Sequence, residues 1–274
     1  MTTTHLLVID PQNDFCDGPA PHTPALPVPG ADADMRRLAH FVTAAGDAID
    51  AITVTLDSHH RLDVAHPTFW QRGDGGAVTP FTPITAAQLR SGEFVPRDAS
   101  VRTRVQAYLD ALEAGGRYTL MVWPVHCEVG TWGHNLHAAV QAACAAWEER
   151  RSRSVDYVFK GLNPWTEHYS AVQAEVPLAD DEGTQLNRAL LERLGRAERV
   201  IVAGEAGSHC VKATVEHLVE HGLGGRADRL VLLTDAMSPV SSFEAQQAAF
   251  LAAMQQRGAR LATTSELLAE LMPA

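Results

Sequence analysis

The chain has 274 residues, of which 46% are hydrophobic and 20% charged, and its formal net charge at pH 7 is −11. This balance is typical of a soluble globular protein and excludes a disordered chain, and the negative charge gives no basic surface, so we expect no nucleic-acid partner. No apolar run approaches the roughly 18 residues that a membrane span needs, so we expect no membrane partner.

The four cysteines show no CxxC pair and no regular spacing; they are Cys16, Cys127, Cys144 and Cys210. A disulfide scaffold is unusual in so long a chain, and reduced thiols suit the cytosol. The apolar run that ends at Asp10 is too short for a signal peptide. We therefore expect a cytoplasmic protein.

Short apolar runs alternate with helical patterns along the chain. In chain order, the predicted strands are His5–Ile9, Ala51–Leu56, Tyr118–Val122, Val155–Phe159, Arg199–Ala203, Arg229–Leu233 and Arg260–Ala262. Most of them lack polar alternation, as parallel strands buried on both faces do.

Amphipathic spacing predicts a helix in most of the intervals between these strands. These helices begin near Asp32, Gly133 and Thr184, and after Ser208 and Ser242. Alternating strands and helices predict an α/β fold with three α/β/α layers around a doubly wound, mostly parallel six-stranded sheet. We expect a single domain over residues 1–274.

The segment Gln71–Gly116 interrupts the alternation between the second and third predicted strands. Its first half is rich in Gly and Pro and predicts an irregular loop, whereas Val101–Leu112 carries apolar residues at helical spacing. We interpret the segment as an enlarged connection. Two interpretations of its role stay open: the segment is a lid over the site, or it is a surface embellishment or subunit contact.

Reactive side chains follow five of the predicted strands. In an open α/β sheet, ligands bind at the carboxyl ends of the strands, so these side chains are expected at one edge of the sheet. They are Asp10 after the first strand, Asp57 and His59 after the second, Trp123 and His126 after the third, Lys160 after the fourth, and Cys210 shortly after the fifth.

Cys210 is the candidate nucleophile. It begins the predicted helix after Ser208, where the helix dipole favours a thiolate and free backbone N–H groups can bind an oxyanion. The alternative is a buried structural cysteine, which is the commoner role of a lone Cys.

Asp10 and Lys160 are charged residues that directly follow apolar strands, where an unpaired charge would be costly. Asp10 is the candidate base for the Cys210 thiol and later the acid for the leaving amine, while Lys160 stabilises anions. The alternative is an Asp–Lys salt bridge that only holds the strand ends together.

Asp57, His59 and His126 form a candidate metal site. Asp-x-His at a strand end, with one more His from the next predicted strand, offers three ligands and open positions, the pattern of a catalytic Zn²⁺, Fe²⁺ or Mn²⁺. For His60 and His66 the alternative is a solvated loop.

Several motifs together resemble one known family. The run Val8-Ile9-Asp10-Pro11-Gln12-Asn13-Asp14-Phe15 resembles the opening of nicotinamidases in the isochorismatase-like cysteine hydrolase superfamily. Further matching motifs are Asp57-Ser58-His59, Trp123-Pro124-Val125-His126-Cys127, Lys160-Gly161, Tyr169-Ser170 and Cys210-Val211. The match covers most of the chain outside roughly residues 71–116.

The resemblance implies specific roles for these residues. It implies an Asp10–Lys160–Cys210 triad with an oxyanion hole from the N–H groups of Ala206 and Cys210, and a cis peptide leading into Ala206. It also implies one divalent metal ion, Zn first and Fe or Mn as alternatives. The implied ligands are Asp57, His59 and His126, with His66 as an extra or outer ligand, and the implied substrate-binding residues are Phe15, Trp123 and Tyr169.

The implied enzyme is a homo-oligomeric amidohydrolase that cleaves the C–N bond of a small heteroaromatic amide through a cysteine thioester, with nicotinamide as the first candidate substrate. Glu205 replaces an apolar residue of the family pattern, and Glu167-His168 stands where Asp-Ser is usual. Three alternatives stay open: a related cysteine amidohydrolase for another small amide, a catalytically silent binding protein of the same fold, and a metalloenzyme in which Cys210 is incidental.

Overall fold

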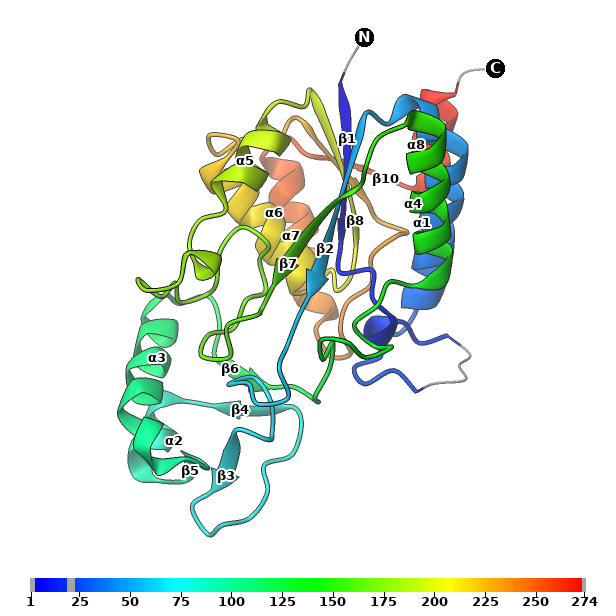
Figure 1. Cartoon of the computed structure of the whole chain (residues 1–274). Helices are drawn as coiled ribbons and strands as arrows, with labels where there is room; N and C mark the ends of the chain where they lie inside the picture. Colours follow the sequence, from blue (N-terminus) through cyan, green and yellow to red (C-terminus); the bar gives the residue numbers. More distant parts are fainter. Residues whose placement is uncertain (1–2, 19–22, 273–274) are drawn as a thin grey trace.

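The computed structural model describes residues 3–18 and 23–272, and its centre is one six-stranded sheet (Figure 1). All neighbouring strands in this sheet are parallel. Their order is β10 (Arg260–Ala262), β9 (Leu230–Leu233), β8 (Arg199–Gly204), β1 (Thr4–Ile9), β2 (Ala51–Asp57) and β7 (Asp156–Lys160).

Helices cover both faces of this sheet, so the predicted three-layer α/β/α fold is confirmed. On one face α1 (Ala31–Ala45) packs against α4 (Ala138–Arg151) and α8 (Thr264–Leu271). The other face carries α5 (Arg188–Gly195), α6 (Cys210–His221) and α7 (Glu244–Gln256) (Figure 1). None of the described helices combines the length and the hydropathy that a membrane crossing requires.

Helix boundaries follow local sequence signals. The apolar stripe of α1 places Met35, Leu38 and Phe41 in the core, fully buried. Helix α8, which apolar spacing did not predict, begins with a capping box between Thr263 and Glu266. Helices α4 and α5 begin four to five residues later than predicted. The 3-10 turns are η1 (Asn13–Phe15), η2 (Gly46–Ala48), η3 (Ala99–Val101) and η4 (Glu182–Thr184).

The prediction that Tyr118–Val122 is a strand of the central sheet is wrong. Only β6 (Leu120–Val122) forms there, and it pairs antiparallel with β4 (Thr82–Ile84), outside the central sheet. Leu120 and Val122 are buried in a separate apolar cluster, so burial explains why this run looks like a core strand. The short strand β10 supplies the sixth place in the central sheet instead.

The enlarged connection is a folded unit with its own apolar core, which begins at Val64 and ends at Val122. The prediction that the first half of the Gln71–Gly116 segment is an irregular loop is wrong. This part of the chain contains β3 (Trp70–Arg72), β4, α2 (Ala86–Ser91) and β5 (Phe94–Pro96). Three-residue strands are too short to show periodicity. The helix predicted at Val101–Leu112 is confirmed as α3 (Arg102–Ala114). Figure 1 shows this unit beyond the carboxyl ends of β2 and β7.

Candidate active site

Three of the predicted catalytic side chains meet at the carboxyl edge of the central sheet. Asp10 directly follows β1, Lys160 is the last residue of β7, and Cys210 is the first residue of α6. The Lys160 Nζ lies 3.0 Å from Asp10 Oδ2 and 3.6 Å from Cys210 Sγ. All three are buried, with exposed fractions of 0%, 2% and 6%.

Neighbouring groups hold these side chains in place. Thr55, on β2, donates its hydroxyl to Asp10 Oδ1 and accepts the Asp10 backbone N–H at 3.0 Å. Lys160 also donates to Asp57 Oδ1 at 2.8 Å and to the His168 carbonyl at 3.0 Å. The ammonium is therefore shared between two carboxylates, so neither strand end carries an unpaired charge.

Burial and charge set the protonation of this cluster. Burial raises the pKa of Cys210, Lys160 lowers it, and Asp10 and Asp57 raise it again, so that it lies well above its usual range. Burial also raises the pKa of Asp10, against the opposing effect of Lys160. Although burial favours the neutral amine, Asp10 and Asp57 hold the pKa of Lys160 well above its usual range. The thiol is therefore protonated at rest, which the helix position of Cys210 did not predict.

The turn before α6 presents unoccupied backbone donors. A cis peptide joins Glu205 to Ala206, and the Ala206 carbonyl accepts the N–H groups of His209 and Val211 at 3.0 and 3.1 Å. Within residues 3–18 and 23–272, no hydrogen bond engages the N–H of Ala206 or Cys210. Such free donors at a helix N-terminus can bind an oxyanion.

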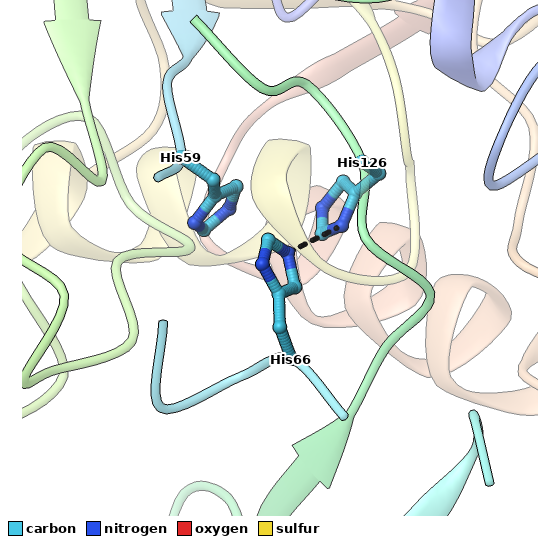
Figure 2. A group of neighbouring side chains, drawn as sticks. All are labelled: His59, His66 and His126. Carbon is cyan, nitrogen blue, oxygen red and sulfur yellow. Dashed lines mark hydrogen bonds between the residues drawn. The ribbon is translucent and has the colours of Figure 1, made fainter. Parts of the chain in front are cut away.

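A cluster of buried imidazoles lies beside Lys160's carboxylate partner Asp57. His59, His66 and His126 each offer a nitrogen within 4.8 Å of the others, and Figure 2 shows the three rings facing one another. Asp57 Oδ2 lies 3.0 Å from His59 Nε2 and 3.3 Å from His126 Nε2. His66, for which a solvated loop was the alternative, is fully buried in this cluster.

The donor set of the cluster fits a divalent transition metal, because three imidazoles and one carboxylate are its preferred ligands in proteins. Burial lowers the pKa of His66 to about 3, which leaves its imidazole neutral. Against burial, Asp57 and Asp63 hold the pKa of His59 well above its usual range. Metal binding would have to displace that proton. Asp63 also orients His59, with its Oδ2 3.0 Å from the ring Nδ1.

A small pocket of about 340 Å³, its mouth included, opens onto Cys210. The Trp123 indole N–H donates to the Tyr169 hydroxyl at 3.0 Å. The lining comprises Phe15, Leu26, Asp57, Trp123, His126, Glu167, Tyr169, Ala206, His209, Cys210 and Val240. All three predicted substrate-binding residues are in this set.

Sequence reasoning missed four of these lining residues: Leu26, Glu167, His209 and Val240. The His209 ring contacts Trp123 and Phe243, with centroids 5.2 and 4.7 Å apart. Burial lowers the pKa of His209 to about 4, so it is a neutral wall of the pocket. The sequence did offer one indication that His209 lines the pocket, because it directly precedes the candidate nucleophile Cys210.

Comparisons with known proteins show what the chain is similar to in sequence. Residues 166–266 match the isochorismatase domain family. The nicotinamidase/pyrazinamidase of Mycobacterium tuberculosis is 27% identical over 234 residues, which are 85% of this chain and 87% of that protein.

Solved structures share the whole fold. A nicotinamidase from Acinetobacter baumanii superposes with a TM-score of 0.64 at 18% identity, over 97% of this chain and 99% of that one. A pyrazinamidase of Pyrococcus horikoshii in complex with zinc superposes with a TM-score of 0.55 at 20% identity, over 95% and 98% of the chains. Residues 166–266 thus match the isochorismatase domain family, and most of the chain is similar in sequence and fold to nicotinamidases and pyrazinamidases.

Proposed function

We propose that this protein hydrolyses the C–N bond of a small aromatic amide, with Cys210 as the nucleophile. One observation carries the proposal: a buried Asp10–Lys160–Cys210 cluster opens onto a small aromatic pocket. The nicotinamidase relatives support amide hydrolysis, and together with the aromatic lining of the pocket they support nicotinamide as the first candidate substrate, with nicotinate and ammonia as products.

The reaction divides between the three residues. Asp10 takes the thiol proton, and Cys210 Sγ adds to the amide carbon while the N–H groups of Ala206 and Cys210 receive the oxyanion. Asp10 then gives its proton to the departing nitrogen, so that ammonia and a thioester form. Water, deprotonated by Asp10, cleaves the thioester to the acid and the free thiol. Lys160 stabilises the anions throughout.

The raised pKa values of Asp10 and Cys210 share one cause, which is burial. The raised pKa of Asp10 makes this carboxylate a stronger base than an ordinary one, whereas the raised pKa of Cys210 makes its thiol a weaker acid. Lys160 keeps the anion that forms on either group paired.

The metal is part of the same proposal. Asp57, His59, His66 and His126 would hold one divalent ion, zinc as the first choice and iron or manganese as alternatives. When bound, the ion supplies a Lewis acid beside the pocket that can bind a ring nitrogen or water. The donor set and the zinc-bound pyrazinamidase support this assignment.

The test is ammonia release from nicotinamide, pyrazinamide and a few aliphatic amides. We expect turnover of the ring amides by the wild type and none by Cys210→Ala. Cys144→Ala is the matched control, because Cys144 is buried in α4, away from the pocket. Turnover by a folded Cys210→Ala protein would refute the nucleophile, and a wild type inert on every amide would refute the activity.

A further inference from the structure

Glu167 carries a polar atom whose partner the fold does not supply. Its side chain is 4% exposed, and Oε1 accepts the His168 backbone N–H at 2.9 Å. Oε2 is buried without a hydrogen bond. Leaving a buried polar group unsatisfied is costly, so such an atom in a native site calls for a partner from outside the chain.

Glu167 also lines the pocket that holds Cys210. Among the residues that the structure describes, it is the one pocket-lining residue with an unpartnered buried side-chain atom. The Asp57 carboxylate is engaged by Lys160 and His59, and the Trp123 indole by Tyr169. Glu167 Oε2 is therefore the atom to which a ligand in this pocket can supply the missing hydrogen bond.

The protonation of Glu167 decides what this oxygen can do. The pKa of Glu167 is raised to about 7. Burial is the main cause, Asp57 and Asp63 act in the same direction, and His59 opposes them. Above that pH both oxygens are acceptors. Because the His168 N–H holds Oε1, the free acceptor is Oε2.

We propose that Glu167 is a specificity-determining residue, whose free oxygen accepts a hydrogen bond from an N–H or O–H group that the substrate carries in addition to its carboxamide. The favoured substrates are then small aromatic amides with an amino or hydroxyl substituent. The inference rests on the proposed function, because the carboxamide of the same ligand must reach Cys210.

Amino- and methyl-substituted aromatic carboxamides, compared at each ring position at pH 8.5, provide the test. The two substituents are nearly equal in size, so their ratio of kcat/KM isolates the hydrogen bond. We expect the wild type to favour the amino compound by about tenfold or more at one ring position, as one bond to a charged acceptor implies.

Glu167→Gln should abolish this preference. The His168 N–H keeps the amide oxygen at the Oε1 place, so the amide NH₂ occupies the Oε2 place and meets the substrate donor as a second donor. Glu167→Leu removes the acceptor altogether and should also abolish the preference, so the test survives misfolding of either variant. The readout is the ratio of kcat/KM for the amino compound to that for the methyl compound, so a general change of activity in either variant cancels.

Glu175→Gln is the matched control. Burial raises the pKa of Glu175 to about 7 as well, and its Oε1 is also unpartnered. Its Oε2, however, lies 3.7 Å from Arg117, and Glu175 is not part of the pocket lining. This variant should keep the amino preference of the wild type.

Calorimetric binding of the same amides to Cys210→Ala separates this inference from the proposed function. An amino preference in binding that Glu167→Gln removes, without ammonia release by the wild type, would support the role of Glu167 and refute the hydrolase. Turnover with equal rates for the amino and methyl compounds at every position would refute the role of Glu167 and leave the hydrolase standing. An equal loss of the amino preference in Glu175→Gln would also refute the role of Glu167.

Discussion

At the scale of single residues, the environment of Cys210 differs from what its helix position suggests. A thiol at a helix N-terminus gains from the dipole, but Cys210 is 6% exposed and faces Asp10 and Asp57 as well as Lys160. The dipole effect is worth about 1 kcal/mol, which is less than burial costs a charged group. The proposed mechanism therefore needs Asp10 as a base, because burial disfavours the thiolate.

Asp10→Asn tests this requirement. Asn has nearly the same shape and can keep its contacts with Thr55, while Lys160 stays paired with Asp57. We expect kcat to fall by roughly 10²- to 10⁴-fold, the range for a lost general base, with little change in KM. Thermal unfolding should show a folded protein. A decrease in kcat below about tenfold would contradict the role of Asp10.

The imidazole cluster is tested by elemental analysis of protein purified without chelator. We expect about one divalent ion per chain in the wild type and a large loss in His126→Ala, which removes one of three converging nitrogens. His134→Gln is the control, because His134 is a buried neighbour that contacts Ser58 and lies outside the cluster. Equal metal content in wild type and His126→Ala would contradict the site.

At the scale of elements, the unit between β2 and β7 contacts Trp123, a lining residue of the pocket, through the aromatic side chain of Phe81. Phe81 is 52% exposed, and its ring lies 5.8 Å from that of Trp123, edge to face. The Phe81 N–H donates to the Val122 carbonyl next to Trp123. This contact favours the interpretation of the Gly- and Pro-rich first half of the Gln71–Gly116 segment, Gly73–Pro83 included, as a lid over the site.

Phe81→Ala should therefore change the relative rates of hydrolysis across amides of different size, by about three- to tenfold, as one lost aromatic contact implies. Its melting temperature should change little, because the side chain is half exposed. Phe159→Ala is the control, since Phe159 is 55% exposed on β7 and is not part of the pocket lining. An unchanged substrate profile, with loss of oligomer instead, would favour a subunit contact.

At the scale of the whole molecule, buried histidines link folding to pH. His5 is on β1, and its Nε2 lies 2.8 Å from the hydroxyl of Thr53 on the neighbouring β2. The pKa of His5 is lowered to about 4, mainly by burial and in addition by the charge of Arg193. The unfolded chain binds this proton at pH near 6.5. The stability that neutral His5 contributes is therefore fully present above pH 6.5 and is lost as the pH falls toward 4.

His5→Gln should remove this dependence. Between pH 6.5 and 4 the unfolding free energy of the wild type, relative to the variant, should fall by up to ~1.4 kcal/mol per pH unit, the slope for one proton. Urea unfolding at several pH values measures the difference, in which the other titrating groups cancel. Parallel pH profiles of the two proteins would contradict the prediction.

The order of strands and helices along the chain was readable from the sequence because each central strand is a run of apolar residues in sequence. The placement of Asp10, Lys160 and Cys210 at one edge follows from that order, since the strands of a doubly wound sheet are parallel. The motifs that resemble nicotinamidases come from the same short, contiguous stretches of chain.

Tertiary structure alone decided the rest. Leu120–Val122 pairs with β4 instead of the central sheet, and a run of three residues cannot specify its partner. His66 reaches His126 from a loop, and Glu167 has one satisfied and one free oxygen in the pocket. Local sequence determines periodicity and caps, because these depend on neighbours within a few residues. Burial, hydrogen-bond partners and pKa depend on segments far apart in the chain, which only packing brings together.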